Sequence, residues 1–269
     1  MPNADTKFIY GACSLTTTTP APQHALIARD LRFRYRRHLP EAVAGVNLQI
    51  PAGQIYGLLG PNGAGKTTTI SLLSTLFKPH SGSLEVAGID ALRQPRKARP
   101  HIGLVPQEIA LYPQLSAREN LAYFGRLYGL SGKRLSARVE LCLDLVGLSE
   151  HAERRVETYS GGMKRRANLA AGIVHQPKLL FLDEPTVGID TQSRSVLLTN
   201  LRQLQTEGMT MIYTTHYMEE AEQLCPRLAI IDHGTIIAEG SPAELIAAEE
   251  GCNNLEDLFL NRTGRQLRD

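Results

Sequence analysis

One glycine-rich loop limits what this chain can fold into. Residues 60–67 read Gly-Pro-Asn-Gly-Ala-Gly-Lys-Thr and satisfy the pattern GxxxxGK(S/T) in full. An apolar run at residues 55–59 precedes the loop, and apolar residues recur after it at helical spacing as far as Phe77. A loop of this kind between a strand and a helix presents backbone N–H groups to phosphate oxygens. The segment therefore predicts a nucleotide-binding βα unit whose helix ends near Pro79.

The loop also predicts which residues meet a nucleotide. Lys66 would reach the β and γ phosphates, and the Thr67 hydroxyl would hold Mg²⁺. The alternative is a glycine-rich turn that merely reverses the chain, and the strand before it and the helix after it argue against that alternative. The residues expected to contact the nucleotide are Gly60, Pro61, Asn62, Gly63, Ala64, Gly65, Lys66, Thr67 and Thr68.

Size and composition exclude several classes of protein. The 269 residues, of which 42% are hydrophobic, suffice for one large domain or two small ones. The formal net charge of +2 gives no reason to expect nucleic acid or an acidic membrane surface as a partner. No run approaches the ~18 apolar residues of a membrane-spanning helix, and the N-terminus lacks the features of a signal peptide. We therefore expect a chain that does not cross a membrane by itself.

The cysteines favour a reducing compartment. Cys13, Cys142, Cys225 and Cys252 are scattered along the chain and form no CxxC pair. This pattern suggests neither a zinc site nor a disulfide framework. A reducing cytosol is the expected setting.

Apolar patterns divide the chain into a tail, a sheet and an insertion. Residues 1–25 are rich in small and polar residues and are expected to form a flexible tail. Apolar runs of strand length at residues 178–182 and 210–215 each follow a helical pattern, which favours a parallel sheet built from βα units. Runs at residues 227–232 and 235–239 predict a late hairpin.

A helical insertion is expected to interrupt this sheet. Ser116 and Glu119 form a capping box at the start of one helix, and a second helix follows it. Near the start of the chain, Phe33 and Tyr35 alternate with arginines and are expected to share one face of a strand. Ser241, followed by proline, is predicted to cap a late helix.

Polar residues at strand ends supply the rest of a nucleotide site. Asp183 ends an apolar strand and is expected to hold Mg²⁺. Glu184 would point toward the γ phosphate and orient or deprotonate water. His216 ends another strand, from which it can bind a phosphate oxygen, Glu184 or water. A solvated turn for the acidic pair and a structural role for the histidine are the alternatives, and the phosphate loop favours the catalytic interpretation.

Two further candidates have little support when each is taken alone. Tyr35 could stack on adenine, although a half-buried core tyrosine is the more common case for an aromatic residue in a strand. Gln107 follows the apolar residues 102–106 and could add a neutral ligand to Mg²⁺ or to its water. By itself neither residue identifies a site.

A second glycine pair raises a question about the number of phosphate sites. The stretch Tyr159-Ser160-Gly161-Gly162-Met163 precedes a helical run and has the ingredients of another phosphate cradle. One domain of this size would not obviously need two such cradles.

Taken in order, these motifs resemble the ATP-binding-cassette (ABC) family of ATPases over about residues 27–240. The resemblance gives each candidate a role. The matching positions are Tyr35 for adenine stacking, residues 60–67 for the Walker A loop, Gln107 for the Q-loop, Ser160, Gly161 and Gly162 for the signature, residues 179–183 for the Walker B strand, Glu184 for the catalytic glutamate, Asp190 for the D-loop and His216 for the switch histidine.

The resemblance implies an α/β fold of the P-loop NTPase (RecA-like) type. Its core would be a mostly parallel sheet, with an N-terminal antiparallel β subdomain and an inserted helical subdomain. The implied ATPase domain spans residues 26–240, with its core at 26–106 and 176–240 and the helical subdomain at 107–175. Residues 241–269 would form a C-terminal helical extension.

The resemblance also gives the second cradle a purpose. In this family two cassettes pack head to tail, so the signature of one closes over the ATP held by the Walker A loop of the other. We therefore expect ATP and Mg²⁺ as cofactors and a second ATPase subunit as partner. A copy of this chain would serve, because the chain carries every motif.

Two features near the signature depart from the family pattern or invite another interpretation. Tyr159 and Met163 stand where Leu and Gln are usual, and we expect both to be tolerated because the Ser-Gly-Gly core is intact. The charged residues 164–166 could be an anion patch, but we expect them to be the solvated side of a helix.

Segments outside the catalytic motifs suggest which machine the cassette drives. Residues 159–166, 214–222 and 254–264 look like the drug-resistance and antibiotic-export branch, whose ATPases pair with ABC-2 type permeases. That resemblance implies an ATPase on the cytoplasmic face of the cell membrane, with its permease a separate chain docked near Gln107 and Tyr112. The transported substance and the permease are not encoded in these motifs, and export follows from family analogy alone.

Two other hypotheses compete with the transporter. A soluble ABC protein of translation or DNA maintenance usually has two fused cassettes or a long coiled coil, whereas this chain has one cassette and a short insertion. An unrelated phosphate-loop kinase would leave Ser160, the paired glycines and His216 without a role. The exporter ATPase accounts for more of the sequence than either.

Overall fold

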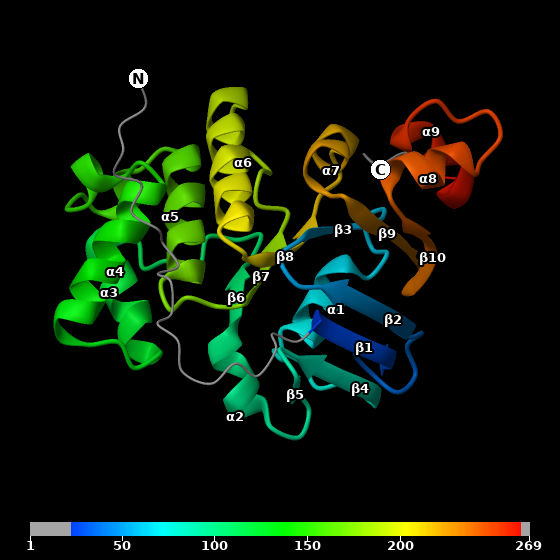
Figure 1. Cartoon of the computed structure of the whole chain (residues 1–269), viewed down its shortest axis with the longest axis horizontal. Helices are drawn as coiled ribbons and strands as arrows, with labels where there is room; N and C mark the ends of the chain where they lie inside the picture. The colour runs from blue at the N-terminus through cyan, green and yellow to red at the C-terminus, as the bar shows by residue number, and fades with distance from the viewer. Residues whose placement is uncertain (1–22, 265–269) are drawn as a thin grey trace.

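The computed structural model describes residues 23–264 and builds them around two sheets (Figure 1). Within these residues, the larger sheet has the strand order β10-β9-β3-β8-β7-β6. Neighbours in it run parallel except β10, which is antiparallel to β9. The strands predicted at residues 55–59, 178–182 and 210–215 and the late hairpin are confirmed to within one residue at each end, whereas β6 was not predicted as a strand. The strands are β3 (Ile55–Leu59), β6 (Ile102–Val105), β7 (Leu179–Asp183), β8 (Thr210–Thr214), β9 (Arg227–Asp232) and β10 (Thr235–Gly240).

The smaller sheet is antiparallel and holds the N-terminal strands. Its order is β2-β1-β4-β5, with β1 (His24–Phe33), β2 (Val43–Pro51), β4 (Ser81–Val86) and β5 (Ile89–Asp90). The prediction that Phe33 and Tyr35 share a strand face is wrong, because Phe33 is the last residue of β1 with a partner on β2. Tyr35 lies in the turn that follows.

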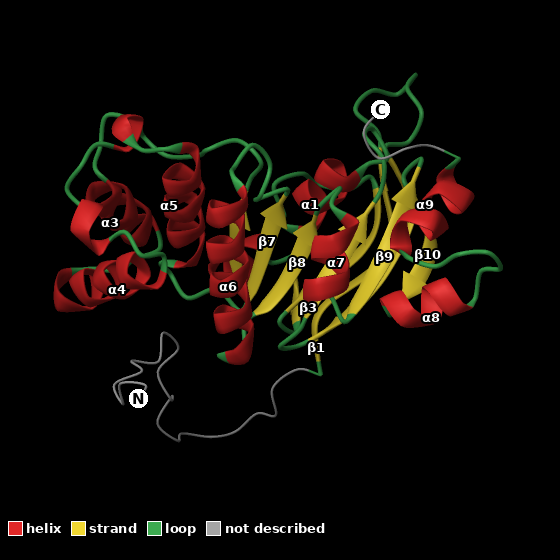
Figure 2. Cartoon of the chain, turned by 90° about the horizontal axis from the view of Figure 1, so that it is seen from above, coloured by secondary structure: helices red, strands yellow, loops and turns green. Residues whose placement is uncertain are grey.

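Alternating side chains of the larger sheet pack into two separate hydrophobic cores, one on each face of the sheet. Leu179 and Phe181 of β7 pack with α1 (Lys66–Leu73) and the smaller sheet, while Leu180 and Leu182 pack with the helices on the other face. Figure 2 shows α6 (Thr191–Thr206) and α7 (Met218–Leu224) along that second face. Helix α1 ends before the predicted proline, because Thr75 takes a left-handed backbone with φ 62°.

The predicted helical insertion consists mainly of three helices, α3 (Ala117–Leu127), α4 (Gly132–Leu145) and α5 (Gly161–Ile173). The capping box of α3 is confirmed: the Glu119 N–H donates to Ser116 Oγ at 3.1 Å, and the Ser116 N–H donates to Glu119 Oε2 at 2.8 Å. Helix α5 lies directly on β6, since a Cβ added to Gly103 would be 2.4 Å from the Gly172 carbonyl oxygen. The short α2 (Pro95–Ala98) precedes β6.

The C-terminal helices lie at the opposite end of the molecule from the insertion (Figure 1). These are α8 (Pro242–Ala247), whose predicted cap at Ser241 is confirmed and forms a capping box with Glu244, and α9 (Leu255–Thr263). Leu258 and Phe259 pack against Met218 of α7 and against β9. The predicted flexible tail falls outside the described residues as far as residue 22, and Cys13 lies there too. Within residues 23–264 no helix is both long and apolar enough to cross a membrane.

Candidate functional site

The phosphate loop borders a cavity of about 320 Å³. Its walls come from the turn after β1, from the loop and the start of α1, and from the segments that follow β6 and β7. All of the lining residues except Ala42 were predicted as site residues from the sequence. The lining consists of Tyr35, Ala42, Pro61, Asn62, Gly63, Gly65, Lys66, Thr67, Thr68, Gln107 and Glu184.

Close backbone contacts fix the loop at both ends. A Cβ on Gly60 would lie 2.3 Å from the Ile231 carbonyl oxygen, and one on Gly65 would lie 2.4 Å from the Ala42 carbonyl oxygen. Gly65 also has a φ of 104°, which favours glycine. Gly60 and the buried Ala64 therefore face the core rather than the cavity.

Lys66 is held inside the loop at the start of α1. Only 6% of its surface is exposed, and its Nζ donates to the Gly60 and Pro61 carbonyl oxygens at 2.8 and 3.2 Å. The same Nζ lies 3.5 Å from Glu184 Oε1. A buried ammonium beside helix-start N–H groups gives this end of the cavity a positive potential that favours phosphate.

Glu184, at the end of β7, lies between the Lys66 ammonium and the His216 ring. Its Oε2 is 3.2 Å from His216 Nδ1, so the carboxylate accepts and the ring nitrogen donates. The hydrogen bond from His216, with the charge of Lys66, holds the pKa of Glu184 below its ordinary value against the opposing effect of burial. The left-handed backbone of Glu184, φ 46°, is strained for a residue other than glycine, and Thr214 Oγ1 accepts its N–H at 2.9 Å.

The donor set at the end of β7 fits Mg²⁺ bound together with phosphate. Thr214 Oγ1 donates to Asp183 Oδ1 at 2.8 Å; burial raises the pKa of Asp183, and hydrogen bonds from Thr214 and Thr67 oppose that rise. Among the described residues there is no group of three or more His, Cys, Asp or Glu that could hold a metal alone. Mg²⁺ normally takes one or two protein ligands besides phosphate and water, so Thr67 and Asp183, with Gln107 nearby, suffice.

Tyr35 borders the cavity from outside the sheet. Its hydroxyl is 2.9 Å from Thr68 Oγ1, and its ring makes edge-on contacts with Phe33 and Phe77. The side chain is 58% exposed. Edge contacts and high exposure leave a ring face open for a stacked base, which a core tyrosine would not have.

The signature residues lie on a separate surface. Ser160 and Gly161 are exposed at the start of α5, where Ser160 Oγ accepts the Met163 N–H. Gly161 lies beside the segment that leads to Asp190, the residue that caps α6. Within residues 23–264, neither Asp190 nor any of Ser160, Gly161 and Gly162 lines the cavity. The predicted site residues therefore form two groups.

The prediction that residues 164–166 are a solvated helix side is wrong for two of them. Arg165 donates to the carbonyl oxygens of Gln107 and Val187, the latter at 2.9 Å. Arg166 donates to the carbonyl oxygens of Val146 and Gly147. Both side chains are half-buried, and burial lowers the pKa of each. They attach α5 to neighbouring loops.

Two other residues of the site were missed by sequence analysis. Asn168 of α5 is buried and brackets the Q-loop: its Oδ1 accepts the Ala110 N–H at 3.1 Å, and its Nδ2 donates to the Pro106 carbonyl oxygen at 3.3 Å. Thr214, described above, holds both acidic residues at the end of β7. A buried amide in an otherwise apolar helical pattern was the available signal for Asn168, and Thr214 had none.

Comparisons with known proteins agree with this geometry. The family model described as "ABC transporter" matches residues 43–187. The linearmycin resistance ATP-binding protein LnrL of Bacillus subtilis (strain 168) is 51% identical over 203 residues, which cover 76% of this chain and 65% of that protein. The Nod factor export ATP-binding protein I of Paraburkholderia xenovorans (strain LB400) is 45% identical over 214 residues, covering 80% of this chain and 70% of that protein.

A solved structure of an ATP binding subunit of an ABC transporter superposes with a TM-score of 0.79 at 25% identity, covering 88% of this chain and 98% of that one. Its likeness confirms the predicted fold class. With the family match it also confirms the resemblance on which the site residues were assigned.

The two signature glycines should respond differently to the same substitution. In Gly162→Ala the new Cβ would lie 2.1 Å from Ser193 Oγ and 2.5 Å from Ser193 Cβ, so we expect a loss of about 1–3 kcal/mol in the free energy of unfolding. In Gly161→Ala the nearest atom is 3.7 Å away, and we expect a change within about 0.5 kcal/mol. Urea unfolding measures both.

The control is the double variant Gly162→Ala/Ser193→Gly. Because it lacks the Ser193 side chain that the new Cβ would strike, it should regain part of the free energy of unfolding lost in Gly162→Ala. Equal destabilisation by the two glycine substitutions would contradict this packing of α5 on α6.

Proposed function

We propose a function that follows from one premise: this chain belongs to the ABC transporter family and is an ATPase of that family. Two copies of the chain pack head to tail around two MgATP and drive a separate ABC-2 type permease. The observation that carries the proposal is the division of the site. The cavity holds the phosphate loop and Glu184, whereas Ser160 and Gly161 face outward at the start of α5. A second copy can bring the start of its own helix α5 to the γ phosphate, on the side away from α1.

Each residue of the cavity has a task in hydrolysis under this proposal. Lys66 and the loop N–H groups bind and orient the phosphates, and Thr67 and Asp183 hold Mg²⁺, which neutralises charge on the phosphate oxygens when bound. Glu184 accepts the proton of the attacking water, and its lowered pKa keeps it ionised for that role at neutral pH. His216 fixes the orientation of Glu184 through its Nδ1–H.

In the proposed dimer, the presence or absence of the γ phosphate determines whether the two copies are closed or separated. Ser160 and the N–H groups of α5 contact a γ phosphate while it is present and lose that contact when it leaves. ATP therefore favours the closed pair, and hydrolysis favours separation. Because this chain contributes both halves, a homodimer has two complete sites.

The cargo is proposed from the relatives. One is a linearmycin resistance protein and the other a Nod factor export protein. We propose export of an antibiotic, drug or lipid-like compound, with this chain on the cytoplasmic face of the cell membrane beneath its permease.

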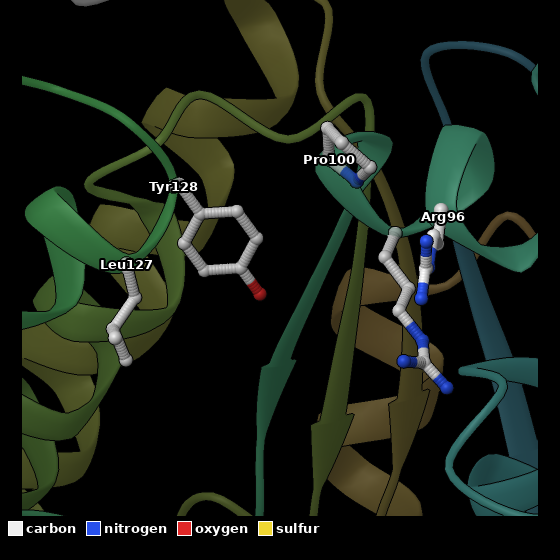
Figure 3. Close-up of a pocket in the computed structure, with 5 residues that line it drawn as sticks. Arg96, Pro100, Leu127 and Tyr128 are labelled. Carbon is white, nitrogen blue, oxygen red and sulfur yellow. The ribbon is translucent and has the colours of Figure 1, made fainter.

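We propose that the permease docks on the insertion and on the adjacent cavity of about 460 Å³ shown in Figure 3. Leu127 and Tyr128, at the end of α3, form one wall and are 63% and 44% exposed. Arg96 and Arg99, from the segment before β6, form the other wall with Pro100. The cavity thus adjoins both the helical insertion and the strand that leads to Gln107, so a cytoplasmic segment of the permease seated here can sense the nucleotide site.

Photocrosslinking tests the docking surface. A photoreactive residue at Tyr112 or Leu127 should form an adduct with a membrane subunit in the assembled transporter. The same residue at Val196, which is 38% exposed on α6, should form none and serves as the control. Adducts at Val196 alone would place the permease elsewhere.

Glu184→Gln tests the assigned chemistry. The amide keeps the shape of the side chain but cannot take a proton, so kcat should fall by at least about 100-fold. ATP binding should persist, and ATP should convert the variant into a stable dimer. Phosphate release and analytical ultracentrifugation measure the two effects, with the exposed Glu219→Gln as the matched control. Ordinary turnover in Glu184→Gln would remove Glu184 from this role.

A further inference from the structure

We infer that Glu220 is a positioning residue for His216, and that it links the histidine to the helix following the D-loop. The inference rests on the proposed role of His216 in hydrolysis. Glu220 belongs to α7, is only 3% exposed and does not line the nucleotide cavity. It was not among the site residues predicted from the sequence.

One carboxylate oxygen of Glu220, Oε2, accepts hydrogen bonds from three hydroxyl groups that belong to three segments of the chain. Thr186 follows the catalytic glutamate, Tyr213 lies on β8, and Thr215 immediately precedes the histidine. The donor-to-acceptor distances to Oε2 are 3.0 Å from Thr186 Oγ1, 2.7 Å from Tyr213 Oη and 2.8 Å from Thr215 Oγ1. An ionised carboxylate only accepts hydrogen bonds, so all three hydroxyls are oriented toward it.

The other oxygen of Glu220 faces a cation from α6. Arg194 Nε lies 3.5 Å from Glu220 Oε1, and the Arg194 guanidinium lies 4.2 Å from the centre of the Tyr217 ring. Tyr217 is the residue after His216. Arg194 therefore contacts both the buried Glu220 carboxylate and Tyr217, the residue on the C-terminal side of His216.

These contacts hold both sequence neighbours of His216. Because the Thr215 hydroxyl donates to Glu220, its oxygen is free to accept the Tyr217 N–H, at 3.0 Å. Thr215 and Tyr217 are thus tied to each other and, directly or through Arg194, to Glu220. A peptide anchored on both sides gives His216 one orientation, in which its Nδ1 reaches Glu184.

The same network reaches the surface that faces the proposed partner. Arg194 lies one turn into α6, whose cap is Asp190. A shift of α6 on dimerisation would therefore move Arg194 against Tyr217 and Glu220. In this arrangement, the orientation of His216 depends on the position of the D-loop.

The test is a double-mutant cycle on the full chain. Glu220→Gln keeps the shape but replaces the acceptor pair with one acceptor and one donor, and we expect kcat for ATP hydrolysis to fall about ten-fold. KM for ATP should be unchanged, because Glu220 lies outside the cavity. In a His216→Ala background, Glu220→Gln should cause no further loss. Glu219→Gln, an exposed change on the same helix, is the control.

The outcomes separate this inference from the role proposed for His216. If His216→Ala leaves kcat unchanged, the role of the histidine fails. If His216→Ala lowers kcat and the loss from Glu220→Gln multiplies with it, or if Glu220→Gln has no effect, the positioning role of Glu220 is wrong.

Thr215→Val provides a second route if Glu220→Gln does not fold. It removes the hydroxyl that joins Glu220 to Tyr217 and should lower kcat without changing KM, and Thr215→Ser should restore activity. A Thr215→Val variant with the turnover of the unmodified protein would overturn the inference.

Discussion

Helix α5 is fixed to the core by contacts that only glycines allow, and the separation of Ser160 and Gly161 from the nucleotide cavity depends on that constraint. Gly103 of β6 has no room for a side chain beneath Gly172, and Gly162 has none beside Ser193 of α6. With the later part of the helix against the backbone of β6 and its start against the Ser193 side chain, Ser160 stays on the outer surface, away from the cavity of its own chain. In the proposed dimer, each copy thus carries two halves of a site that face different directions.

One half-buried and one buried polar side chain connect those two regions inside one chain. Arg165 of α5 binds the Val187 carbonyl oxygen, and Glu220 of α7 accepts the Thr186 hydroxyl. The short segment between Glu184 and the D-loop is therefore held by the signature helix on one side and by the helix after the switch histidine on the other. Charges removed from water are costly unless they are well paired, and here they join segments that both take part in the proposed hydrolysis.

The sequence predicted the features that are local in the chain. The phosphate loop, the helix caps at Ser116 and Ser241 and the polar ends of the strands each depend on a few adjacent residues, and the structure has them where expected. Contacts between distant segments were not predictable in this way: Arg165 and Val187 are 22 residues apart, and Thr186 and Glu220 are 34 apart. Backbone geometry explains the early end of α1, since Thr75 takes a left-handed conformation that the apolar pattern does not signal.

The central claim is that each complete site takes its phosphate loop from one copy and its signature from another. Mixing two inactive variants before adding ATP tests it most directly. Glu184→Gln inactivates the half that holds the phosphate loop, and Gly161→Asp inactivates the signature half by placing a carboxylate where that half meets phosphate. In a mixed dimer one site combines both intact halves, so the mixture should hydrolyse ATP although neither variant does alone. If the mixture stays inactive while mixed dimers form, or if Gly161→Asp alone is fully active, the shared site is contradicted.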